Sequence, residues 1–277
     1  MAIITLLTDY GTVDSYVGEM KGVLLSLAPG ATLVDLTHEV APGDLASAAY
    51  VVGRAWHRFP PGTVHLAVVD PGVGTQRTAL AFSTRGHYFV GPDNGLWSGV
   101  MHGAPVEAVT LAPPPQASPT FHGRDIFAPA AARLASGEPL TSLGAAYTSI
   151  PRRVSGALPH HEGKVVVGEV IYVDRYGNLV TNLTPEVVPA YAVLEAESLV
   201  VGPLRSTFGD VPTGALLAGS THSALRNVAF GAMPGVVPAW PPRTTLALCT
   251  ACSTSFSPSD STAPTQPGAP ATTGIIW

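Results

Sequence analysis

The 277-residue sequence predicts an α/β N-terminal domain with a central, largely parallel sheet, followed by a smaller, mainly β C-terminal domain. The first part is predicted because, up to about residue 140, strand-like apolar runs alternate with segments whose apolar residues recur at helical spacing. The second part is predicted because the apolar runs beyond residue 163 become short and strand-like. We therefore expect domains at residues 1–150 and 163–252, with a tail at residues 253–277.

The first three elements are expected to be a strand, a helix and a second strand. Ala2–Leu7 is an apolar, β-rich run that is closed by the polar residues 9–11. Val13–Leu27 carries apolar residues at helical spacing, and a Pro-Gly pair ends it. Thr32–Leu36 then has the pattern of a strand. This order predicts a βαβ unit, in which the two strands lie parallel.

The remaining elements of the first domain continue the alternation. Asp44 is expected to cap a helix, because it follows a Pro-Gly turn and precedes an apolar-periodic segment. The later segments are, in order, a helix at Leu45–Trp56, a strand at Thr63–Val69, a hairpin of Thr78–Ser83 and Tyr88–Val90, and a helix at Asp125–Ala135. In a parallel sheet, ligands are expected just after the carboxyl ends of the strands.

The second domain follows a polar connection that is rich in helix breakers, around residues 148–163. Its predicted strands are Lys164–Val173, Leu179–Leu183, Tyr191–Leu194, Ser198–Val201 and Ala215–Leu217. Apolar residues between positions 226 and 252, such as Val228, Phe230 and Leu246–Leu248, are expected to supply a further strand. The tail at residues 253–277 is rich in Ser, Thr, Pro, Ala and Gly, and we expect it to be disordered.

The composition excludes several classes of protein. Charged residues make up only 12% of the chain, about half the usual share, and 46% of residues are hydrophobic, which excludes disorder driven by charge. The net charge of −5 argues against a nucleic-acid or acidic-membrane partner, which would require a basic face. No apolar run approaches the length of a membrane span, and the N-terminus lacks the basic start of a signal peptide. Because the chain has only two cysteines, we expect no disulfide framework, and we expect a cytoplasmic location.

A Gly-rich loop at residues 68–77 places a carboxylate at the end of a predicted strand and an arginine seven positions later. One interpretation puts Asp70 and Arg77 at the rim of a pocket, bent towards each other by Gly72 and Gly74. The alternative is an ordinary Asp-Pro-Gly turn with a surface arginine. The loop is not a dinucleotide-binding fingerprint, because it lacks a third glycine and precedes a hairpin.

Other polar positions also allow two interpretations. His122, just before a predicted helix, suits a general base or a solvated loop residue. Asp9 suits a ribose contact or a helix cap. Asn94 lies in a segment that is typical first of a turn and only second of a site. Residues 174–178 combine a carboxylate, an aromatic ring and an amide, which suits a polar ligand or a hairpin turn. Cys249 and Cys252 form a lone pair, so neither zinc nor any other metal is expected.

Five of these segments together resemble the S-adenosylmethionine (SAM) hydrolases, also called SAM hydroxide adenosyltransferases, which are relatives of the fluorinases and chlorinases. The matching segments are, in order, Leu7–Gly11, Val69–Gly74 with Arg77, Val90–Leu96, Thr120–Phe127 and Asp174–Asn178. The resemblance covers residues 1 to about 222. It implies hydrolysis of SAM to adenosine and L-methionine without a cofactor, by a homotrimer whose sites lie between neighbouring subunits.

The resemblance also implies roles for single residues. Asp70, Arg77 and His122 correspond to the trio that handles water, and which of them is the base is left open. The halogenating relatives carry tyrosine in place of Asp70 and lack the histidine, so hydroxide is the expected nucleophile. The implied substrate contacts are Asp9 on the ribose, Phe121 near the adenosine, Asp174 and Asn178 at the methionine end, Tyr176 stacked on a ring, and in addition Asn94, Gly123 (serine in the fluorinases) and Ser220.

The resemblance ends at about Leu225, and the composition changes from Arg226 onwards. A reading-frame shift in the gene or a divergent tail would each produce this change. Two alternatives to hydrolysis therefore stay open: a SAM- or adenosine-binding protein without turnover, whose adenine pocket is degraded, and a SAM-dependent halogenase, which Asp70 and His122 disfavour.

Overall fold

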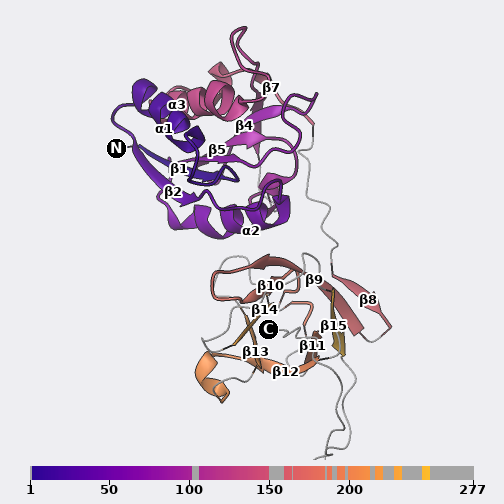
Figure 1. The fold of residues 1–277 in the computed structure, drawn as a ribbon. Coiled ribbons are helices and arrows are strands. Elements are labelled where there is room, and N and C mark those ends of the chain that lie inside the picture. The colour runs from indigo at the N-terminus through magenta and orange to yellow at the C-terminus, as the bar shows by residue number, and fades with distance from the viewer. Residues whose placement is uncertain are drawn as a thin grey trace, which may run out of the picture. The chain divides into compact units, whose positions relative to one another are not determined.

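The computed structural model describes residues 2–101, 106–149, 159–163, 165–184, 186–188, 192–196, 199–212, 216–220, 228–232 and 245–249. The chain divides into two compact units, Met1–Gly156 and Ala157–Trp277 (Figure 1). The division falls in the breaker-rich connection that separates the two predicted domains.

The first unit contains a seven-stranded sheet in the order β2-β1-β3-β5-β4-β6-β7. The strands are β1 (Ile3–Thr8), β2 (Thr32–Thr37), β3 (Val64–Val68), β4 (Ala79–Thr84), β5 (His87–Pro92), β6 (Glu107–Thr110) and β7 (Ala145–Ala146). The pairs β1–β2, β1–β3 and β3–β5 are parallel, whereas β4–β5, β4–β6 and β6–β7 are antiparallel. The predicted α/β class is confirmed, and the sheet is mixed, with a parallel half and an antiparallel half.

The change of direction comes from the predicted hairpin. Arg85 and Gly86 connect β4 to β5 with φ angles of 50° and 80°. Positive φ at both central residues is typical of a two-residue hairpin turn, which can join only antiparallel strands. The short strands β6 and β7 then extend this antiparallel half, and the sequence patterns did not predict them.

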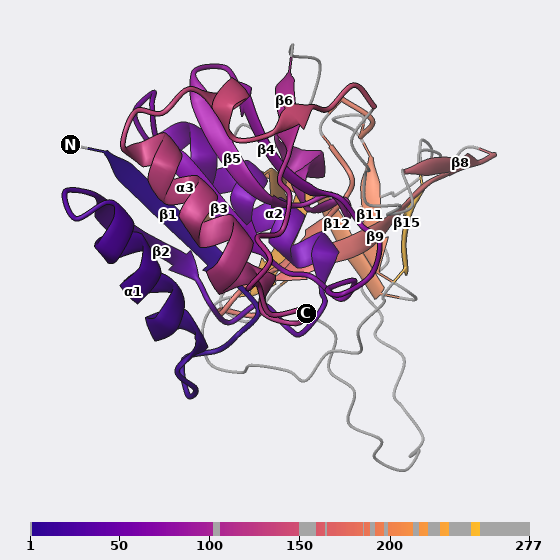
Figure 2. The same cartoon turned by 90° about the horizontal axis from the view of Figure 1, so that it is seen from above.

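Helices cover both faces of the sheet. α1 (Tyr16–Leu27) and α3 (Ala128–Ala135) pack side by side on one face, and α2 (Leu45–Ala55) covers the other (Figure 2). Two buried clusters match this arrangement: one joins α1 and α3 to the sheet, and the other joins α2 to the opposite face. Asp44 caps α2 as predicted, because its carboxylate accepts from the Ser47 N–H at 3.1 Å.

The helix predicted at Asp125–Ala135 begins with a wider turn. Gly123–Phe127 forms a π-helical turn, in which the Ala128 N–H donates to the Gly123 carbonyl, and α3 continues from Ala128. Turns of this kind are rare and are frequently found at functional sites.

The parallel strands end at one edge of the sheet. Thr8 at the end of β1 is in register with Val68 at the end of β3, and β5 runs parallel beside β3. Because their carboxyl ends meet at this edge, Asp9, Asp70 and Asn94 leave the sheet on the same side.

The second unit contains an eight-stranded sheet in the order β10-β14-β13-β12-β11-β15-β9-β8. The strands are β8 (His160–Glu162), β9 (Val165–Val173), β10 (Leu179–Thr181), β11 (Val193–Ala196), β12 (Leu199–Arg205), β13 (Leu216–Ser220), β14 (Val228–Ala232) and β15 (Thr245–Cys249). β9 pairs with both β15 and β10, so the sheet closes on itself around a small apolar core. The predicted mainly β character is confirmed.

Two strands lie beyond the point where the resemblance ends. β14 fits between β10 and β13, and β15 fits between β11 and β9. One strand was predicted within residues 226–252, and the structure has two strands there, β14 and β15. The tail at residues 253–277 and Cys252 lie outside the described residues. Within the described part of the chain, no helix is long and apolar enough to cross a membrane.

Candidate active site

Asp70, Arg77 and His122 lie in direct contact, in that order. The Arg77 Nε donates to Asp70 Oδ2 at 2.8 Å, and Arg77 Nη2 contacts the same oxygen. Arg77 Nη2 also lies 2.7 Å from His122 Nδ1. Only 6% of the Arg77 side chain and 5% of the Asp70 side chain are exposed, so the ion pair is nearly dry. The structure thus brings the three predicted catalytic residues together.

The loop between Asp70 and Arg77 turns back on itself. The Val73 N–H donates to the Asp70 carbonyl at 3.2 Å, and Gly74 has a φ of +78°. A Cβ on Gly74 would lie 3.1 Å from the Pro119 carbonyl oxygen, so the turn favours glycine there for both backbone angle and space. The guanidinium of Arg77 then packs over the Phe127 ring, 5.2 Å from its centroid. The turn was one of the two interpretations of this loop, but the arginine is buried and not a surface residue.

The contact with Arg77 decides the protonation of His122. A guanidinium has only donors, so His122 Nδ1 must accept, and a neutral ring then carries its proton on Nε2. Burial lowers the pKa of His122, and the positive charge of Arg77 lowers it further, while the carboxylates of Asp70 and Asp125 act in the opposite direction. His122 is therefore a neutral hydrogen-bond donor near neutral pH.

Asp70 has one oxygen in use and one available. Both contacts from Arg77 reach Oδ2, whereas Oδ1 is buried and has no hydrogen-bond partner among the described residues. Buried carboxylate oxygens are rarely left without a partner in folded proteins. Oδ1 is therefore the acceptor that the trio offers to a small molecule.

Asp9 leaves the same edge of the sheet, one strand away. Its Oδ2 accepts from the Gly43 N–H at 2.8 Å, and Gly43 has a φ of +74°. Burial raises the pKa of Asp9, and this backbone hydrogen bond partly offsets the rise. The carboxylate is thus held by the loop before α2.

The nitrogen and the oxygen of the Asn94 side-chain amide both form hydrogen bonds with backbone groups. Its Nδ2 donates to the Val69 carbonyl at 2.8 Å, and its Oδ1 accepts from the Leu96 N–H at 3.2 Å. These bonds tie the loop after β5 to the residue that precedes Asp70. The observed contacts of Asn94 are therefore with the loops that carry the site.

Phe121 and Gly123 lie against Tyr10, a residue that the sequence interpretation did not assign to the site. The ring centroids of Phe121 and Tyr10 are 6.1 Å apart, in an edge-to-face arrangement. A Cβ on Gly123 would lie 2.5 Å from Tyr10 Oη and 3.1 Å from Met20 Sδ. Any side chain at position 123, including serine, therefore requires Tyr10 to move. The only sequence signal for Tyr10 was its place in the Leu7–Gly11 motif.

The remaining predicted contacts lie in the second unit. Asp174 Oδ1 accepts from the Tyr176 and Asn178 N–H groups at 2.8 and 2.9 Å, and Oδ2 accepts from Asn178 Nδ2 at 2.7 Å. Asp174 and Asn178 thus form the turn between β9 and β10, in which Gly177 has a φ of +82° and Tyr176 is 76% exposed. Ser220 ends β13, and its side chain lies outside the described residues.

The described residues contain no group of three or more His, Cys, Asp or Glu side chains arranged to hold a metal ion. Cys249 lies in β15, where its backbone pairs with Val165 of β9.

Known proteins share this sequence and fold. Residues 4–144 match the SAM hydroxide adenosyltransferase N-terminal domain, and residues 168–225 match the C-terminal domain of the same family. The chain is 41% identical over 241 residues to an (R)-S-adenosyl-L-methionine hydrolase of Thermus thermophilus. This alignment covers 83% of this chain and 92% of that protein. A hydrolase of the same description from Salinispora arenicola is 40% identical, covering 82% of this chain and 89% of the relative.

More distant relatives and a solved structure complete the comparison. A fluorinase of an Actinoplanes species is 31% identical, over 65% of this chain and 71% of that enzyme. A crystal structure of an uncharacterized conserved protein from Thermotoga maritima superposes with a TM-score of 0.78 and 34% identity, covering 89% of this chain and 99% of that one. The two domain matches and the identity to the hydrolases agree with the motifs and the site geometry. The chain belongs to the SAM hydroxide adenosyltransferase family.

Proposed function

We propose that this protein hydrolyses SAM to adenosine and L-methionine. Water supplies the oxygen that bonds to C5′ of the adenosyl group, and the C5′–S bond breaks with its electron pair going to sulfur. The proposal rests on the contacts of Arg77 with Asp70 and His122, in which the Asp70–Arg77 ion pair is almost fully shielded from solvent. The protein is also 41% identical to a SAM hydrolase. The leaving group is a neutral thioether, which needs no general acid, so the site has only to orient and deprotonate water.

Asp70 takes the proton in this mechanism. His122 Nδ1 accepts from Arg77 and Nε2 already carries a proton, so the neutral ring has no lone pair left for water. Asp70 Oδ1 is the available acceptor, and it receives the proton as the oxygen attacks C5′. Arg77 stabilises the negative charge that develops on the attacking oxygen, and the His122 Nε2–H orients it.

The predicted substrate contacts are part of the proposal. Asp9 binds the ribose hydroxyls, and Phe121 packs near the adenosine. Asp174, Tyr176 and Asn178 contact the substrate from the β9–β10 turn, and Asn94, Gly123 and Ser220 are further contacts. The exposed ring of Tyr176 supports a stacking role, since an aromatic side chain so exposed can stack on another ring.

We further propose that the reaction needs no cofactor or metal, and that the protein is a cytoplasmic homotrimer. Departure of a thioether from a sulfonium requires no Lewis acid, which supports the first statement. The family resemblance is the support for the homotrimer, and the two-cysteine composition for the location. Light scattering of the purified protein measures the assembly.

Incubation with SAM in the presence of a chelator, followed by chromatography, tests the activity. Adenosine and methionine should appear in equal amounts, and the Asp70→Asn, Arg77→Ala and His122→Ala variants should each lose most of the rate. Loss of turnover on addition of chelator would exclude the metal-free mechanism. A 5′-halo-adenosine formed with added chloride or fluoride would instead support a halogenase.

One observation keeps a non-catalytic alternative in view. The C-terminal domain match ends at residue 225, and the composition of the chain changes from Arg226 onwards. A protein that binds SAM or adenosine without turnover would show tight binding by calorimetry and no product from SAM. Product formation by the wild-type chain excludes this alternative.

A further inference from the structure

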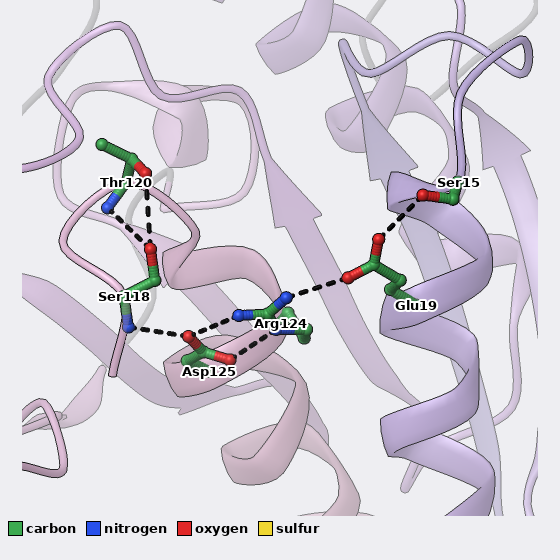
Figure 3. Close-up of polar contacts among 6 residues, drawn as sticks. All are labelled: Ser15, Glu19, Ser118, Thr120, Arg124 and Asp125. Atoms are coloured by element: carbon green, nitrogen blue, oxygen red, sulfur yellow. Dashed lines mark hydrogen bonds and ion pairs between the residues drawn. The ribbon is translucent and has the colours of Figure 1, made fainter. Parts of the chain in front are cut away.

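Figure 3 shows a cluster of charged side chains around Arg124, which lies two residues after His122 in the chain. The cluster takes no part in the proposed reaction. Arg124 Nε donates to Asp125 Oδ1 at 2.6 Å, and Arg124 Nη2 donates to Asp125 Oδ2 at 3.0 Å. The third nitrogen, Nη1, donates to Glu19 Oε2 at 2.9 Å. All three guanidinium nitrogens are thus held by two carboxylates. We call Arg124, Asp125 and Glu19 the Arg124 clamp.

The clamp joins three separate segments of the chain (Figure 3). Asp125 Oδ2 accepts from the Ser118 N–H at 2.8 Å, which ties down the loop that leads to the site. Glu19 lies in α1, where its Oε1 accepts from Ser15 Oγ at 2.8 Å. Arg124 itself lies in the π-helical turn. The loop, the π-helical turn and α1 are therefore fixed to one another by the clamp.

The same guanidinium contacts Phe121. Its Cζ lies 4.5 Å from the Phe121 ring centroid, and the Tyr16 and Phe121 rings pack edge-to-face with 5.6 Å between their centroids. The backbone of Phe121 is also held, because its carbonyl accepts from the Asp125 N–H at 3.1 Å. Phe121 immediately precedes His122, so whatever fixes Phe121 also fixes the backbone from which the histidine projects.

The stability that the clamp supplies is too small to account for so complete a network. The Arg124 and Glu19 side chains are 33% and 39% exposed, and an ion pair this accessible adds little to stability because water screens it. A displacement of the reacting groups by about 1 Å, by contrast, can slow an enzyme about 100-fold. The larger consequence of the clamp is geometric.

The geometry points to Arg124 as a positioning residue for the proposed reaction: held by Asp125 and Glu19, it sets the place of Phe121 and the alignment of His122 Nδ1 with Arg77. This inference rests on the proposed function. Asp125 adds an electrostatic effect, because its carboxylate opposes the lowering of the His122 pKa by burial and by Arg77; Asp70 is the other carboxylate that does so.

The test compares Arg124→Lys with a matched control, Arg133→Lys, in the last turn of α3. Lysine keeps the charge but cannot form the forked contacts. Arg133 makes the same kind of forked pair with Glu138, its Nε donating to Glu138 Oε2 at 2.6 Å, and is not part of the site. We expect Arg124→Lys to lower kcat for SAM hydrolysis about tenfold to 100-fold with little change in Tm, and Arg133→Lys to leave kcat unchanged.

Two further measurements separate positioning from simple loss of structure. Asp125→Asn removes a negative charge near His122 and so lowers the pKa of His122. The acid limb of the kcat–pH profile should therefore move to lower pH, whereas Arg133→Lys should not move it. Glu19→Gln breaks one arm of the clamp while keeping a hydrogen-bond acceptor, and it should lower kcat less than Arg124→Lys. If Arg124→Lys fails to fold, these two variants decide the question.

The nitrogen NMR signals of His122 test the clamp independently of turnover. The wild-type ring should show the Nε2–H tautomer, and Arg124→Lys should show a mixture of tautomers. If the wild-type protein does not hydrolyse SAM, the proposed function is overturned. The comparison of His122 tautomers then tests on its own whether Arg124 positions His122. Unchanged kcat, pH profile and tautomer in Arg124→Lys would overturn the positioning role.

Discussion

At the scale of single residues, the site depends on which atoms of Asp70, Arg77 and His122 are occupied by one another. Arg77 takes one oxygen of Asp70 and one nitrogen of His122. The remaining atoms, Asp70 Oδ1 and His122 Nε2–H, are an acceptor and a donor. Water needs that combination in order to be oriented and deprotonated, whereas a halide ion would be repelled by the carboxylate.

The contact between Tyr10 and Gly123 gives a residue-scale prediction. Gly123→Ser should lower both Tm and SAM turnover, because its Cβ would lie 2.5 Å from Tyr10 Oη. Tyr10→Phe removes that oxygen, so the double variant Tyr10→Phe/Gly123→Ser should recover part of the lost Tm. Thermal unfolding of the two single variants and the double variant measures the coupling. Strictly additive effects in the double variant would show that the contact is not the cause.

At the scale of elements, a buried polar chain links β1, β3 and β5. His65 Nδ1 lies 2.8 Å from Thr5 Oγ1, and His65 Nε2 lies 3.2 Å from His87 Nδ1. His65 is fully buried and stacks on Phe89, with 5.0 Å between ring centroids. Burial, with a smaller effect of His87, lowers the pKa of His65 to about 3. The folded sheet thus keeps this ring neutral.

The pKa of His65 predicts how stability changes with pH. In the unfolded chain the pKa returns to about 6.5, so below that pH the unfolded state binds a proton that the folded state binds only near pH 3. Stability should therefore fall as pH falls through this window, by about 1.4 kcal/mol per unit from this residue. Urea unfolding at pH 7 and pH 5 should show a smaller loss for His65→Gln than for the wild type. Equal losses would contradict the assignment.

Local patterns predicted the elements more completely than their assembly. The Pro-Gly turn and apolar spacing around Asp44 predicted α2 and its cap, because capping depends on residues a few positions apart. The Arg124 clamp was not predicted, because it depends on Ser118 and Glu19, which lie in other segments. The predicted trio came from motifs, and only the fold showed that Arg77 lies between its two partners.

At the scale of the whole molecule, the second unit depends on strands from beyond the family match. β14 and β15 are both interior strands of the closed sheet, although the C-terminal domain match ends at residue 225. The hydrogen-bonded sheet therefore continues past the end of the C-terminal domain match.

Two truncations test this organisation. Ending the chain after Cys252 removes only the tail, so Tm and SAM turnover should be unchanged. Ending it after Leu225 removes β14 and β15 from the interior of the sheet, so the second unit should fail to fold. A lower Tm after the first truncation would show that the tail stabilises the protein. Full activity after the second would show that β14 and β15 are dispensable.

The central claim is that water activated at Asp70 is the nucleophile in SAM cleavage. Hydrolysis in water labelled with heavy oxygen, followed by mass spectrometry of the adenosine, tests this claim most directly. We predict one labelled oxygen at the 5′-hydroxyl, and a rate about 100-fold to 10,000-fold lower for Asp70→Asn, with the control Glu138→Gln unchanged. Unlabelled adenosine, or an Asp70→Asn variant as fast as the wild type, would contradict the account.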